Sequence, residues 1–89
     1  MITNAEIKHV RSLREKKFRE ANGEFVVEGE KMVREALDSG LELAGLWRIE
    51  DIGENAMSRM SQLSSPSPVL AVLKIPLRDN LSQTLQRGL

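Results

Sequence analysis

Few residues in this sequence could perform chemistry. His9 is the single histidine, and the chain contains neither cysteine nor tyrosine. A nucleophile needs an activating base beside it, usually a histidine, but His9 lies among lysines and arginines, as a surface residue would. With one histidine and no thiolate, no convergent set of metal ligands can be assembled. We therefore expect neither a catalytic residue nor a metal site in these 89 residues.

Glycines and carboxylates give no stronger sign of an active site. The stretch 23–29 lacks both the G-x-G-x-x-G pattern and the lysine-serine ending of a phosphate-binding loop, which argues against nucleotide binding by those routes. Acids on a charged helix more often stay solvated or pair with cations than act as paired catalysts. Glu28 differs because it ends a predicted strand, where α/β folds place ligand sites. One hypothesis is that Glu28 and Gly29 have a positional role, such as orienting a neighbouring cation.

Positive charge is concentrated near the N-terminus. Residues 1–21 hold six Lys and Arg against three acids, residues 22–60 hold four against nine, and residues 61–89 hold three against one, although the net charge is zero. A neutral domain with a cationic end can still attract phosphate, because the local field steers the encounter. The cations that could contact nucleic acid are Lys8, Arg11, Arg14, Lys16, Lys17 and Arg19. The alternative is that these side chains only form the solvent-exposed face of a helix and bind no ligand.

The N-terminal cations lie on a predicted helix. Thr3 or Asn4 can cap its start. Ile7, Val10 and Leu13 recur at three-residue spacing, which places them on one apolar stripe. We expect one cationic helix that ends at the turn signal at residues 21–23.

Three apolar runs predict strands, at residues 25–27, 43–49 and 69–73. The first and last lack alternation, which is typical of strands covered on both faces, and we expect residues 25–27 to form the central strand. Trp47, in the second run, either anchors the core or offers a stacking platform for a base. Further helices are predicted around Met32 to Leu37 and around Ala56 to Leu63. The alternation of predicted helices and strands along the chain predicts an α/β fold with a small, largely parallel sheet and helices on both faces.

Length and composition limit the remaining possibilities. The chain is long enough for one core but not for two. It has no apolar leader and no apolar run that could span a membrane, so we expect a cytoplasmic protein. Residues 64–68 predict a stiff, proline-containing loop. Residues 77–89 carry a leucine at every fourth position, and we interpret them as a linker or docking segment.

Two motifs in combination carry a resemblance to a known family. Lys16-Lys17-x-Arg19 precedes Phe25-Val26-Val27-Glu28-Gly29-x-Lys31, and Ser65-Pro66 stands shortly before the last apolar run. Over about residues 2–75, the sequence resembles the N-terminal substrate-binding domain of SpoU-type (TrmH-like) RNA 2′-O-ribose methyltransferases.

This resemblance implies a three-layer α/β/α sandwich like the kink-turn-binding ribosomal-protein fold. It implies an RNA substrate-binding domain over residues 1–76, with structured RNA (rRNA or tRNA) as its partner. Residues 77–89 would lead to a separate C-terminal methyltransferase domain, which would bind S-adenosylmethionine and dimerise, so no cofactor is expected in this chain. The matched cations include Lys31, which joins the RNA-contact candidates.

A different class of function also fits the sequence. In that reading the domain is a protein-interaction module, whose interface would be the acidic middle of the chain and the leucine stripe at 77–89.

Overall fold

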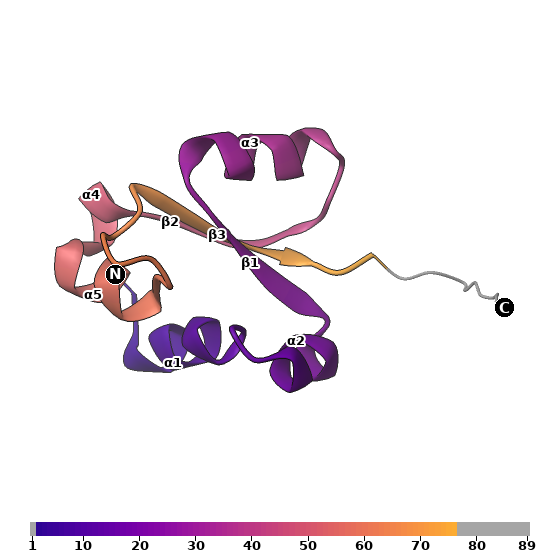
Figure 1. The fold of residues 1–89 in the computed structure, drawn as a ribbon, viewed down its shortest axis with the longest axis horizontal. Helices are drawn as coiled ribbons and strands as arrows, with labels where there is room; N and C mark the ends of the chain where they lie inside the picture. Colours follow the sequence, from indigo (N-terminus) through magenta and orange to yellow (C-terminus); the bar gives the residue numbers. More distant parts are fainter. Residues whose placement is uncertain (1, 77–89) are drawn as a thin grey trace, which may run out of the picture.

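The sheet is built around its last strand. In the computed structural model, which describes residues 2–76, β3 (Val69–Lys74) lies between β1 (Glu24–Glu28) and β2 (Leu43–Arg48) (Figure 1). Both neighbours pair with β3 in the antiparallel sense. The expectations of a largely parallel sheet and of a central strand at residues 25–27 were therefore wrong. The helices are α1 (Asn4–Ser12), α2 (Lys16–Asn22), α3 (Glu30–Asp38), α4 (Ile49–Ile52) and α5 (Glu54–Met60).

The lengths of the connections explain the antiparallel pairing. Helix α3 links β1 to β2 as a crossover, so these two strands run in the same direction and leave a gap between them. After β2, the short helices α4 and α5 make no long return across the sheet. The chain therefore enters the gap at the end where β1 and β2 finish. There the Gly29 N–H donates to the Val69 carbonyl (2.9 Å), and the Ile49 N–H donates to the Pro68 carbonyl (3.0 Å).

Successive residues of β3 pack on opposite sides of the sheet. Leu70 and Val72 belong to a core cluster with α1 and α5, whereas Val69, Ala71 and Leu73 belong to a second cluster with α3. All five side chains are at most 2% exposed. The continuous apolar run is therefore covered on both faces, as predicted, with α3 on one side of the sheet and α1 on the other (Figure 1).

The predicted single N-terminal helix is in fact two helices. Thr3 and Glu6 form a capping box at the start of α1, which ends at Ser12. The next residue, Leu13, is 1% exposed and completes the apolar stripe. The Arg19 guanidinium donates to the carbonyls of Leu13 (3.1 Å) and Arg14 (2.8 Å). Because a side chain from α2 satisfies these carbonyls, the chain can turn there without losing their hydrogen bonds.

Two further boundaries differ from expectation. The second strand ends at Arg48, and α5 ends at Met60, so Leu63 lies in the following loop with 57% of its surface exposed. The helix ends there because Ser61 adopts extended backbone (φ −71°, ψ 143°). Trp47 is half-buried against the α1–α5 cluster, so it contributes to the core while part of the residue stays accessible to solvent. The leucine stripe at 77–89 lies outside the described residues.

Candidate nucleic-acid interface

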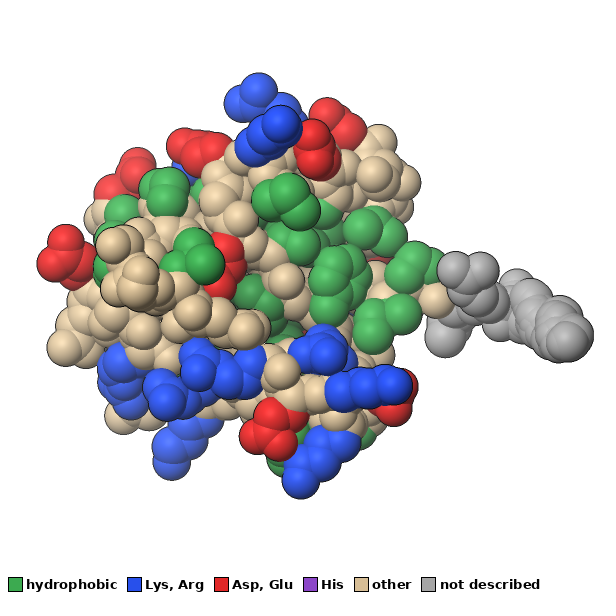
Figure 2. Space-filling model, in the orientation of Figure 1, with side chains coloured by type: hydrophobic (Ala, Val, Ile, Leu, Met, Phe, Trp, Pro, Cys, Tyr) green, Lys and Arg blue, Asp and Glu red, His purple; other side chains and the backbone are tan. Residues whose placement is uncertain are grey.

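The predicted N-terminal cations lie together on one side of the molecule. Figure 2 shows Lys and Arg side chains gathered along the side that α1 and α2 occupy in Figure 1. We call this set the basic band. Its members are Lys8, Arg11, Arg14, Lys16, Lys17 and Arg19. Lys31 lies instead on the first turn of α3, which covers the other face of the sheet, so the structure does not bring it into the band.

The arginines of the basic band are engaged in holding the fold. Arg11 donates to the Arg59 carbonyl (3.2 Å) at the end of α5, and Arg14 donates to the Ser61 carbonyl (3.3 Å) just beyond it. Arg19 closes the junction between α1 and α2, as described above. These guanidinium groups compensate for carbonyls at helix ends, where backbone acceptors lack an intrahelical partner. Their first role is therefore structural, and any contact with a ligand would use their remaining donors.

The lysines of the basic band are less constrained. Lys8 is exposed on α1. The Lys16 ammonium is 3.9 Å from a Glu20 carboxylate oxygen, with the two side chains 78% and 67% exposed. Such a surface pair contributes little to stability. The Lys17 ammonium lies 5.1 Å from the centre of the Phe18 ring. These lysines can therefore turn toward phosphate without breaking a buried interaction.

The structural role of Arg19 leads to a prediction. Arg19→Gln should lower the free energy of unfolding by about 1–2 kcal/mol, because it removes charge-assisted bonds to two carbonyls. Lys17→Gln, on the same helix, should cost less than about 0.5 kcal/mol. Urea denaturation of the two variants checks this difference. Equal losses would show that the guanidinium contacts do not hold the α1–α2 junction.

Glu28 holds the loop between α5 and β3. Its Oε1 accepts hydrogen bonds from the hydroxyls of Ser61 (2.5 Å) and Ser67 (2.8 Å), and its Oε2 accepts one from the Gln62 N–H (2.9 Å). Both serines are at most 5% exposed. One carboxylate therefore fixes the two ends of loop 61–68. Arg14 donates to the carbonyl of the same Ser61, so this serine contacts both side chains.

Gly29 allows the chain to turn sharply after Glu28. Its φ is +95°, a region that favours glycine, and its N–H donates to the Val69 carbonyl. Its own carbonyl accepts from the Val33 N–H (3.0 Å) in the first turn of α3. Gly29 thus joins the end of β1, the start of β3 and the start of α3, which keeps loop 61–68 beside the Glu28 carboxylate.

The bonds of Glu28 give a second prediction. Glu28→Gln should destabilise the domain by about 1–3 kcal/mol, because a neutral amide accepts more weakly and adds donors beside two buried hydroxyls. Hydrogen exchange of loop 61–68 should rise in this variant. The matched control is Glu30→Gln. Glu30 is 60% exposed, and its carboxylate contacts an Arg48 nitrogen at 3.5 Å in a pair on the surface. That control should change stability by less than about 0.5 kcal/mol. Unchanged exchange of loop 61–68 in Glu28→Gln would contradict the assignment.

Sequence reasoning missed several participants at this site. Arg59 provides the carbonyl that Arg11 contacts, and its guanidinium lies 3.5 Å from the Asn4 side-chain oxygen. Ser61 and Ser67 resembled ordinary loop residues. Their partners lie on other elements, so no local pattern could have identified them.

Residues 2–76 contain no cluster of metal ligands and no helix that could span a membrane. No group of three or more His, Asp or Glu residues gathers in this part of the chain as metal ligands would. None of its helices is long and apolar enough to cross a membrane.

Comparisons with known proteins identify the type of domain. A family model for the MRM3-like substrate binding domain matches residues 4–73. No curated protein matches the chain significantly.

Solved structures give related matches. A Porphyromonas gingivalis protein assigned to the TrmH family of RNA methyltransferases is 29% identical with a TM-score of 0.74, over 85% of this chain and 36% of that one. An AdoMet-bound rRNA methyltransferase from Sinorhizobium meliloti is 26% identical with a TM-score of 0.71, over 88% of this chain and 36% of that one. An RNA 2′-O-ribose methyltransferase shares the fold at 22% identity and a TM-score of 0.74, over 93% of this chain and 39% of that one. The chain thus spans little more than a third of the length of these structures.

Proposed function

Because the chain belongs to the family of MRM3-like substrate-binding domains, we propose that it binds folded RNA through its basic band and presents it to a methyltransferase domain. The observation that carries this proposal is the gathering of exposed lysines on the α1–α2 side of a chain whose net charge is zero. Lysines that neutralise phosphates release counterions, and this release drives binding to RNA. The domain would bind without catalysing a reaction itself.

The kind of RNA follows from the scarcity of aromatic residues. Only 3% of the residues are aromatic, so the domain has few platforms on which successive bases could stack. Recognition of a folded RNA by its backbone and shape suits this surface better than reading a long single strand. A structured rRNA or tRNA is therefore the substrate class that we propose.

Several finer features belong to the same proposal. The helices on both sides of the sheet would form a three-layer sandwich like the kink-turn-binding ribosomal-protein fold. S-adenosylmethionine would bind to a separate catalytic domain that also dimerises, since this chain covers only 36% of the AdoMet-bound rRNA methyltransferase that it resembles. Residues 1–76 would be the RNA-binding unit, residues 77–89 would link it to that domain, and the cytoplasm would be its location.

A titration of the 89-residue chain tests the proposed function. Fluorescently labelled rRNA fragments and tRNA would be followed by anisotropy at about 50 and 200 mM salt. We expect binding that weakens steeply with salt and favours one folded RNA. Absence of binding even at the lower salt concentration would overturn the proposal and favour the protein-interaction reading.

A further inference from the structure

A pocket of about 300 Å³ opens between α1 and the sheet. The periodicity of the helix places Lys8 and Arg11 on one flank of α1 and Glu6 and His9 on the other. Arg11 reaches α5, whereas Glu6 and His9 line the pocket. The members of the basic band on α1, Lys8 and Arg11, and the pocket therefore lie on opposite flanks of this helix.

The pocket combines an apolar wall with a polar rim. Val10, Trp47 and Val72 contribute the wall. The six-membered ring of Trp47 occupies the space that a side chain at position 45 would need, because a Cβ on Gly45 would lie 2.6 Å from the Trp47 Cη2 atom. Gly45 thus lets the indole pack against the backbone of β2 and serve as a fixed aromatic surface.

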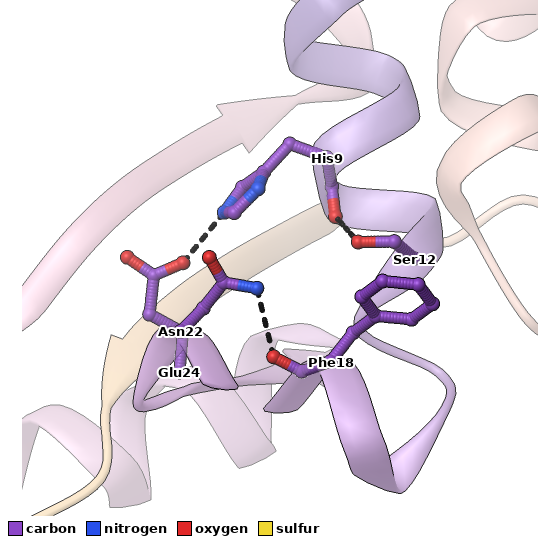
Figure 3. A network of polar contacts seen from close by, with 5 residues as sticks. All are labelled: His9, Ser12, Phe18, Asn22 and Glu24. Carbon is purple, nitrogen blue, oxygen red and sulfur yellow. Dashed lines mark hydrogen bonds and ion pairs between the residues drawn. The ribbon is translucent and has the colours of Figure 1, made fainter. Parts of the chain in front are cut away.

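The rim is formed by a hydrogen bond between side chains of two elements. His9 Nε2 on α1 lies 2.6 Å from Oε1 of Glu24, the first residue of β1 (Figure 3). The Glu24 side chain is 16% exposed and the His9 side chain 44% exposed. Among the described residues, the side-chain contact of Glu24 uses Oε1, which leaves Oε2 to accept a hydrogen bond from a ligand. Glu6 adds a second carboxylate to the lining.

This chemistry selects the kind of ligand. Two carboxylates repel phosphate, so the pocket does not repeat the role of the basic band. An aromatic wall suits a flat heterocycle, and a carboxylate acceptor suits a ligand that presents an amino group. Guanine, adenine and cytosine each carry an exocyclic amino group with two N–H donors, whereas uracil carries none and offers only the N–H of its ring imide. In RNA recognition, phosphate contacts position the protein and contacts to unpaired bases give specificity.

We propose that the pocket holds one unpaired, amino-bearing nucleobase of the bound RNA, with Trp47 against the base and Glu24 accepting from its amino group. The inference rests on the proposed function, because the base would belong to an RNA whose phosphates contact the basic band. One helix, α1, would then present phosphate contacts on one flank and a base contact on the other.

Trp47 makes the pocket directly observable, because it is the single tryptophan of a chain without tyrosine. The chain would be titrated with hexamers of adenylate, cytidylate and uridylate, which carry equal charge, while tryptophan emission is followed. We expect a saturable change with the adenylate and cytidylate hexamers, with affinities about tenfold higher than for uridylate, the effect of one hydrogen bond to a charged acceptor. Equal affinity for all three hexamers would overturn the inference.

Two variants locate the response. Ala44→Leu, which places a larger side chain in the lining, should abolish the Trp47 response to all hexamers. Glu24→Gln should reduce the preference over uridylate to within about twofold, because an amide can also donate to uracil. Glu20→Gln, at a residue whose side chain is 67% exposed on α2, is the matched control and should keep the preference. A response that survives Ala44→Leu in a folded protein would place the base elsewhere and overturn the inference.

The outcome separates this inference from the proposed function. Salt-sensitive binding of folded RNA with no change in Trp47 emission would overturn the base pocket and leave the RNA-binding function intact. A base-selective Trp47 response without binding of any folded RNA would support the pocket and overturn the proposed function.

Discussion

Replacing Lys16 and Lys17 together by glutamate should weaken RNA binding at about 50 mM salt by more than tenfold and reduce the slope of log affinity against log salt by about 2. The Lys16 side chain is 78% exposed, and neither ammonium group is held in a buried contact. The variant should therefore fold normally, with a free energy of unfolding within about 0.5 kcal/mol of the parent chain. Anisotropy titrations over a salt series, with urea denaturation alongside, measure both quantities.

A matched control separates the position of charge from its amount. Arg34→Glu combined with Arg48→Glu changes the net charge equally, but these residues lie on α3 and at the end of β2, where Arg48 pairs with Glu30 of α3, outside the basic band. This control should retain most of the affinity, because contacts with phosphate depend on local charge. If both double variants lost affinity equally, net charge alone would explain binding and the basic band would not be the interface.

The largest effect on stability should come from Leu70→Ala. Leu70 is 0% exposed at the centre of β3 and packs in the cluster beneath α1 and α5. Truncating it should cost about 3–5 kcal/mol, from lost burial and the cavity left behind. A chain of this length has a total stability of roughly 4–13 kcal/mol, so much of the variant could be unfolded at room temperature.

Leu43→Ala provides the comparison for this variant. Leu43 is 43% exposed at the start of the edge strand β2, and its truncation should cost less than about 1 kcal/mol. Urea denaturation of both variants tests the difference. Comparable losses would mean that β3 does not form the centre of the core.

The parts of the fold that local patterns predicted are those that depend on near neighbours in the sequence. The spacing of Ile7, Val10 and Leu13 predicted a buried helical stripe, and the run at 69–73 predicted a strand covered on both faces. Strand order depends instead on where the chain re-enters the sheet. Residues 25–27 and 69–73 show the same continuous apolar pattern, so that pattern could not decide which strand is central or in which direction it runs.

The residues of the candidate site also fall into those that local sequence could identify and those that it could not. The exposed lysines could be predicted from local charge density, since they need no partner in the fold. The role of Glu28 could not, because its serine partners lie 33 and 39 residues further along the chain. The place of Glu28 at the end of a predicted strand indicated a positional role, but the donors that it binds became identifiable only in three dimensions.

The placement of β3 between β1 and β2 also determines when the sheet can form during synthesis on the ribosome. β1 and β2 are not neighbours, so neither strand has a pairing partner until β3 is available. The strand register pairs Glu24 with Lys74. Pairing residues that are so far apart in the sequence requires closing a long loop, which slows folding. During synthesis, the apolar faces of the first two strands must therefore wait unpaired until residues 69–74 leave the exit tunnel. Until that point, the nascent chain is most prone to aggregate and most open to binding by chaperones.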